Sequence, residues 1–148
     1  MIKMVGVVVT GHGNFATGLE SSLKLIYGGS SHIKFVDFIE GESTDTLKAN
    51  LNAAFDELKE EGSILVLSDL LGGSPFKMAV ESKFERQDVP IQVVAGTSFA
   101  LLLACATMIE MFDDARDLAE AAIVEGKDAM TLFALEEETE ENSDEEGI

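Results

Sequence analysis

The segment from Met4 to Thr10 reads Met-Val-Gly-Val-Val-Val-Thr, without the polar and apolar alternation of a half-exposed strand. Continuous β-branched runs of this kind are typical of strands that are covered on both faces. Comparable runs follow at Ile33–Phe38, Ser63–Ser68 and Ile91–Ala95. A chain with these runs must supply helices for both faces of a sheet.

Helical patterns lie between the predicted strands, at Ala16–Tyr27, Thr44–Glu60 and Pro75–Arg86. Strands and helices that alternate with short connections form parallel sheets through right-handed crossovers. We therefore expect an α/β protein with a flavodoxin-like, doubly wound and mainly parallel sheet.

The last part of the chain departs from this alternation. Thr97–Phe112 and Asp113–Ala129 have the pattern of two successive helices, and Thr131–Leu135 that of a short strand. A strand reached without a full crossover belongs at an edge of the sheet, either antiparallel or paired with another subunit.

The composition excludes several classes of protein. The chain has 148 residues and a formal net charge of −18, which repels the phosphates of nucleic acids and anionic lipids. Its longest apolar run, Phe99–Ala106, is far shorter than the roughly 20 residues that cross a membrane. With no targeting segment recognised at the start, we expect a cytoplasmic protein without membrane insertion.

Neither a metal nor a disulfide is expected to hold the core together. A chain of this length buries about 68–70% of its unfolded surface, and Cys105 is the single cysteine. Metal-ligand spacing of Cys and His is absent. Because residues 136–148 hold many acids and no base, we expect a folded domain over residues 1–135 and a solvated, disordered acidic tail after it.

The loops that follow the strands are the places to search for chemistry, because ligands bind beyond the carboxyl ends of strands in open parallel sheets. His12 follows the first predicted strand and lies between Gly11 and Gly13, which permit a sharp turn and a close approach. Taken alone, the motif favours a turn with an exposed histidine.

Asp69 holds the corresponding position after the third predicted strand, which neighbours the first in a doubly wound sheet. A carboxylate there can accept a hydrogen bond from one ring nitrogen of His12 and fix its tautomer. Gly72 and Gly73 precede Ser74, predicted as the N-cap of a helix, and two glycines at that place can expose backbone N–H groups to an anion. No Walker lysine or Gly-x-Gly-x-x-Gly motif supports a nucleotide cofactor, and we expect none.

Four segments together carry a family resemblance: Gly11-His12-Gly13, Phe38–Glu42, the run Asp-Leu-Leu-Gly-Gly-Ser-Pro-Phe at Asp69–Phe76, and Val94–Gly96. In this order and spacing the chain resembles the enzyme IIA component of the mannose family of the bacterial sugar phosphotransferase system. The resemblance covers about residues 2–135.

The resemblance implies a phosphotransferase that carries a phosphoryl group on histidine. His12 would accept it from the phosphocarrier protein HPr and pass it to a IIB component, with Asp69 as the orienting carboxylate. Gly72, Gly73 and Ser74 would form part of the phosphate environment, as would the glycines that flank His12. The family also implies a homodimer in which Thr131–Leu135 crosses to the sheet of the other subunit.

Two residues depart from the family pattern: Leu70 stands where relatives can carry a hydroxyl residue, and Lys77 where Asn is frequent. Two other functions remain open. The phosphotransfer subunit of a dihydroxyacetone kinase system resembles this family, although it tends to carry Ser at the place of Gly13. A flavodoxin-like interaction module without catalysis would leave His12 incidental and unphosphorylated.

Overall fold

The computed structural model describes residues 4–135 and shows the expected parallel sheet. Its strand order is β2-β1-β3-β4. The strands are β1 (Val5–His12), β2 (Ile33–Phe38), β3 (Ser63–Ser68) and β4 (Ile91–Val94). The helices are α1 (Phe15–Ile26), α2 (Thr44–Leu58), α3 (Ser74–Glu85), α4 (Phe99–Met108) and α5 (Ala115–Ala129), with 3₁₀ turns η1 (Lys59–Glu61) and η2 (Ile109–Met111).

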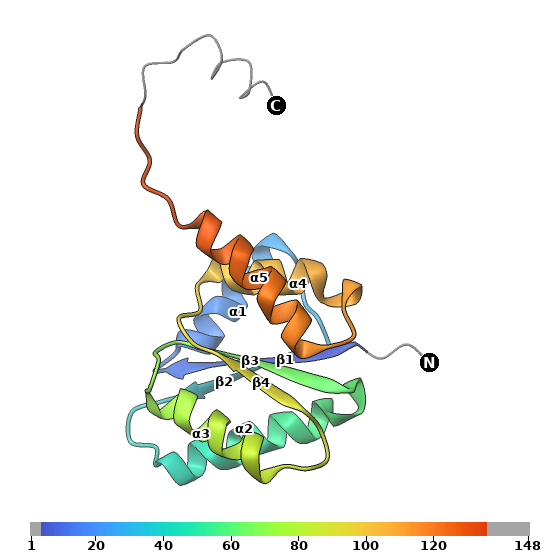
Figure 1. The fold of residues 1–148 in the computed structure, drawn as a ribbon. Coiled ribbons are helices and arrows are strands. Elements are labelled where there is room, and N and C mark those ends of the chain that lie inside the picture. The colour runs from blue at the N-terminus through green and yellow to red at the C-terminus, as the bar shows by residue number, and fades with distance from the viewer. Residues whose placement is uncertain (1–3, 136–148) are drawn as a thin grey trace.

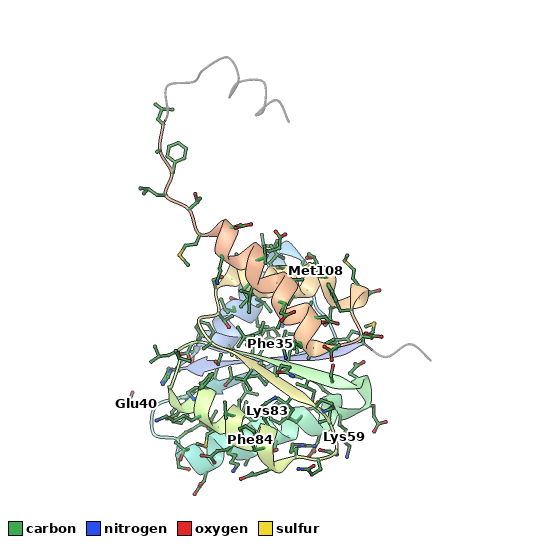
Figure 2. All side chains as sticks on the ribbon, viewed as in Figure 1. Phe35, Glu40, Lys59, Lys83, Phe84 and Met108 are labelled. Carbon is green, nitrogen blue, oxygen red and sulfur yellow. The ribbon has the colours of Figure 1, made fainter. Side chains whose placement is uncertain are left out.

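Helices cover both faces of the sheet, as the continuous apolar strands require. Figure 1 shows α1, α4 and α5 on one face and α2 and α3 on the other. Alternate residues of β1 point into separate cores: Val7 and Val9 face the first helix layer and Val8 the second. Phe35, labelled in Figure 2, packs against the core beneath α1 and α4.

The chain crosses from β1 to β2 on one side of the sheet and then to β3 on the other. The strand order therefore reverses between β1 and β3, and the crevice beyond their carboxyl ends is where such sheets bind ligands. Both His12, the last residue of β1, and Asp69, directly after β3, lie at this edge.

Side chains cap three of the helices at their N-termini. Ser43, Ser98 and Asp114 accept hydrogen bonds from the first turns of α2, α4 and α5. In contrast, the first turns of α1 and α3, which begin beside His12 and Asp69, donate no hydrogen bond to a side chain of their own N-cap residues. The two helices nearest the candidate site thus keep N-terminal N–H groups that their own cap residues do not satisfy.

The expected last strand is not formed within this chain. Residues 131–135 have no regular structure, and Leu132, Phe133 and Leu135 are almost fully exposed. The segment leads away from α5 and the sheet (Figure 1), and a strand needs the edge of a neighbouring strand for its hydrogen bonds. The predicted acidic segment, 136–148, lies outside the described residues.

Candidate functional site

His12 and Asp69 are in direct contact at the carboxyl edge of the sheet. Asp69 Oδ2 lies 2.8 Å from the backbone nitrogen of His12 and 2.8 Å from its Nδ1. A carboxylate only accepts hydrogen bonds, so Nδ1 carries the proton and donates it. The side chain of His12 is 46% exposed and that of Asp69 only 16%. The carboxylate therefore fixes the orientation of the ring and leaves Nε2 as the nitrogen without a proton in the neutral ring.

Asp69 is held in its ionised form by the groups around it. Desolvation raises the pKa of this carboxyl, but the hydrogen bonds donated by the backbone and ring of His12 oppose it, as does one from the Leu70 N–H at 2.7 Å. The net result is a pKa below the ordinary value. A carboxylate that stays ionised is suited to stabilise positive charge on the adjacent imidazole.

The ring of His12 lies close to Phe38 and to the turn that precedes α3. Its centroid is 6.0 Å from that of Phe38, at an interplanar angle of 60°. A Cβ added to Gly73 would lie 2.7 Å from His12 Cε1, closer than carbon atoms approach without overlap. Glycine at position 73 is what lets the backbone pass so close to the ring.

The sequence suggested that Gly72 and Gly73 expose their N–H groups to an anion, and for Gly73 the structure shows otherwise. The N–H of Gly73 donates to the Leu70 carbonyl at 3.0 Å, and that of Gly13 donates to the Phe38 carbonyl at 2.7 Å. Gly72 has φ +81°, a left-handed conformation that favours glycine and turns the chain into α3. A side chain at Gly11 would collide with the ring of Phe15.

The start of α3 differs by one residue from the prediction. Gly73, with extended backbone, is the N-cap, so Ser74 and Pro75 are the first two helical residues. Since the N-cap is a glycine, α3 has no side-chain capping hydrogen bond. Since Pro75 has no N–H, the first turn offers the N–H groups of Ser74 and Phe76, which point out of the N-terminus beside His12.

Exposed apolar side chains lie in the turns that follow β3 and β2 at this edge of the sheet. Leu70 is 60% and Leu71 74% exposed in the turn after Asp69, and Ile39 is 49% exposed after β2. Phe15 and Phe99, which also lie near this edge in the sequence, pack against the core. Beyond Ile39, Glu40 projects away from the body of the molecule (Figure 2).

The sequence assigned no role to Phe38 and Ile39, although both belong to a segment that carries the family resemblance, and it gave no sign of Asp37 as a residue of this edge. Asp37 accepts hydrogen bonds from the N–H and hydroxyl of Thr17, at 3.0 and 2.6 Å. The alternation of residues in β2 placed its side chain on the same face as Phe35, which is the face covered by α1. This alternation was the sequence signal that could have placed Asp37 next to α1.

The other candidate groups lie away from the site or are absent. His32, the other histidine of the chain, lies before β2; its side chain is 30% exposed, and its Nδ1 pairs with Glu61 Oε2 at 2.5 Å. Within residues 4–135 there is no cluster of three or more potential metal ligands. Over the same range, no helix is both long enough and apolar enough to cross a membrane.

The topology and the exposed imidazole place this chain among flavodoxin-like α/β proteins that present a histidine at the switch point of the sheet. The protein belongs to the EIIA-man family, because the family model described as PTS system fructose IIA component matches residues 6–123. It is thus a component of the sugar phosphotransferase system, as its resemblance to the mannose-family IIA proteins implied.

Individual relatives agree with this assignment. The chain is 31% identical over 107 residues to the fructose-specific EIIA component of Bacillus subtilis, and the match covers 72% of each protein. It is 27% identical over 128 residues to the mannose-specific EIIAB component of Escherichia coli, a match that covers 85% of this chain but only 38% of that protein.

Solved structures show the same fold. A phosphotransferase system component EIIA from Streptococcus agalactiae superposes with a TM-score of 0.79 at 31% identity, covering 86% of this chain and 96% of that one. The mannose/sorbose-specific IIA subunit from Enterococcus faecalis gives a TM-score of 0.79 at 25% identity, with coverages of 94% and 100%.

Proposed function

We propose that this protein is a cytoplasmic phosphocarrier that accepts a phosphoryl group from phospho-HPr on Nε2 of His12 and passes it to a IIB component during sugar uptake. One observation carries the proposal: Asp69 accepts the Nδ1 hydrogen bond of an imidazole that is otherwise exposed. Of the two ring nitrogens, this leaves Nε2 with a lone pair for attack on phosphorus.

In the transfer step, the Nε2 lone pair forms a bond to phosphorus as the P–N bond of phospho-HPr breaks. The electron pair of that bond returns to the histidine of HPr. The proton on Nδ1 stays in its hydrogen bond to Asp69, so the imidazole becomes cationic beside an ionised carboxylate. This compensation lowers the free energy of the phosphorylated ring, and the same steps in reverse order deliver the group to IIB.

The oxygens of the phosphoryl group would meet the first turn of α3. His12 Cε1, which is bonded to both ring nitrogens, lies against Gly73, the N-cap of that helix. A group on Nε2 is therefore close to the N–H groups of Ser74 and Phe76 and to the positive end of the helix dipole. Leu70 supplies no hydroxyl at this place, so backbone groups and the Ser74 hydroxyl carry the contact.

Both partners must reach the same atom in turn, which requires an open site. The apolar rim of Leu70, Leu71 and Ile39 supports such docking, because exposed apolar side chains around a polar centre are typical of interaction surfaces. The net charge of −18 favours partners with basic residues around their own histidine.

The test is transfer of labelled phosphate from phosphoenolpyruvate through enzyme I and HPr to the purified protein, with His12→Ala and His32→Ala as matched variants. We expect acid-labile label on the wild type and on His32→Ala, and none on His12→Ala. No label on the wild type beside active HPr would contradict the proposal. It would favour the dihydroxyacetone kinase pathway or a module without catalysis.

We also propose a homodimer in which the segment 131–135 pairs with the β4 edge of a second copy. A groove of about 270 Å³ runs along that edge between β4 and α5, lined by apolar side chains that include Val94, Leu101 and Ile123. The segment itself exposes Leu132, Phe133 and Leu135, which no contact within residues 4–135 covers. Burying such side chains is worth about 1.5–3 kcal/mol each.

Sedimentation of the full chain tests the dimer. Phe133→Asp in the segment should give a monomer, because it places a charge in the groove. Phe84→Asp is the matched control, since Phe84 is 72% exposed on α3 and lies outside the groove. A wild type that sediments as a monomer, or a Phe133→Asp variant that remains dimeric, would contradict the proposal.

A further inference from the structure

Asp37, in the neighbouring strand β2, accepts the capping hydrogen bond that the N-cap residue of α1 does not accept. It lies opposite Gly11 in the parallel register of β1 and β2, one residue before the pair formed by His12 and Phe38. Its two carboxylate oxygens accept the N–H and hydroxyl of Thr17 in the first turn of α1. Asn14, the N-cap of the helix by position, makes no capping hydrogen bond with its side chain.

The two helices that begin beside His12 therefore differ at their N-termini: a carboxylate compensates the positive end of α1, and none compensates that of α3. At α1 a carboxylate occupies the positive end of the helix dipole and one of its N-terminal N–H groups. At α3 the first turn holds no acidic residue, and no side-chain cap is made. An anion bound to His12 would meet an open helix N-terminus on one side and a compensated one on the other.

We propose that Asp37 is a positioning residue that prevents α1 from holding the phosphoryl group on His12, so that α3 alone binds it and the group remains easy to transfer. This inference rests on the proposed function. A carrier that stabilised its phosphorylated form at two helix termini would pass the group on less readily, because tighter binding of the intermediate deepens the well from which transfer must start. The negative charge of Asp37 raises the free energy of the phosphorylated state, although its hydrogen bonds are to Thr17 and not to the His12 ring.

The experiment compares the wild type with Asp37→Asn, whose amide oxygen can still accept the Thr17 N–H while the charge is gone. The primary readout is the equilibrium ratio of phosphorylated protein to phospho-HPr. The second readout is the half-life of protein phosphorylated by phosphoramidate, a small chemical donor that needs no partner protein. We expect both to rise about two- to fivefold in Asp37→Asn, the effect typical of one charge at a helix terminus.

Two controls separate charge from structure. Thr17→Val removes one hydrogen bond and keeps the charge, and Asp45→Asn removes an acid from the first turn of α2, so both should match the wild-type ratio. If Asp37→Asn does not fold, Asp37→Ser carries the same test, because its hydroxyl is neutral and accepts a hydrogen bond.

The outcomes distinguish this inference from the proposed function. An unchanged or lowered ratio in Asp37→Asn would overturn the inference and leave Asp37 as a structural cap. The same rise in Thr17→Val would also overturn it, because geometry would then be the cause. A wild type labelled by phosphoramidate but never by HPr would overturn the proposed function, and the half-lives would still decide the role of Asp37.

Discussion

Gly73→Ala should impair phosphorylation of His12 while leaving the fold nearly intact. The added Cβ would lie 2.7 Å from His12 Cε1 and 3.3 Å from the Leu70 carbonyl oxygen. Carbon atoms in contact are separated by about 3.5–4.0 Å, so the ring must move by about 1 Å. Alanine itself fits the backbone, because Gly73 has φ −73° and ψ 169°.

The displacement acts on the Nδ1 hydrogen bond, which is 2.8 Å long in the wild type. A ring shifted by about 1 Å loses that bond and misaligns Nε2, and a misplacement of this size can cost about 100-fold in rate. The assay is the initial rate of label transfer from phospho-HPr, with urea unfolding in parallel. We expect the rate to fall by about that factor and the free energy of unfolding to change by about 1 kcal/mol or less.

Gly29→Ala is the matched control, because a Cβ there meets nothing within 4 Å and the backbone is not left-handed. Its transfer rate should equal that of the wild type. A Gly73→Ala protein that phosphorylates at the wild-type rate would refute the reasoning. Loss of the fold in Gly73→Ala, measured by urea unfolding, would also refute it.

Three further predictions concern the fold and its ionisable groups. The pKa of Asp69 is below its ordinary value of 3.8 in the folded protein, so its ionisation stabilises the fold above that pH and this contribution is lost as the pH falls through the lowered pKa. The stability gap between wild type and Asp69→Asn in urea should therefore narrow in acid, and a gap that widens there would contradict the assignment. Burial raises the pKa of Cys105 to about 12, so a thiol reagent should modify it only after unfolding, and modification of the native protein would show that the site opens. Phe55 is fully buried, and Phe55→Ala should cost about 3–5 kcal/mol in urea unfolding, whereas a loss below about 1 kcal/mol would contradict the packing.

The sheet and the central pair of the site follow from the sequence for a simple physical reason. Four β-branched runs separated by helical patterns leave few ways to bury apolar surface, and the structure has those four strands in parallel. His12 ends one strand and Asp69 directly follows another, and such a sheet sets these two strands side by side. Their contact is a consequence of topology, which periodicity reveals.

Details that depend on interatomic distances could not be predicted from the sequence. The Gly-Gly pair suggested an exposed row of N–H groups, but Gly73 mainly provides room for the His12 ring. The segment 131–135 forms no strand with residues 4–135, because extended backbone needs a partner edge, and the sequence left open whether that edge belongs to another subunit. Asp37 was passed over because it lies inside a strand, and its link to Thr17 joins residues that are 20 positions apart.

The most direct test of the account is to identify the phosphorylated nitrogen. Protein with ¹⁵N-labelled histidine, phosphorylated through HPr, gives long-range proton–nitrogen spectra that distinguish the two nitrogens of His12. We predict phosphate on Nε2 and a protonated Nδ1, because Asp69 Oδ2 lies 2.8 Å from Nδ1. Phosphate on Nδ1, or on His32, would contradict it.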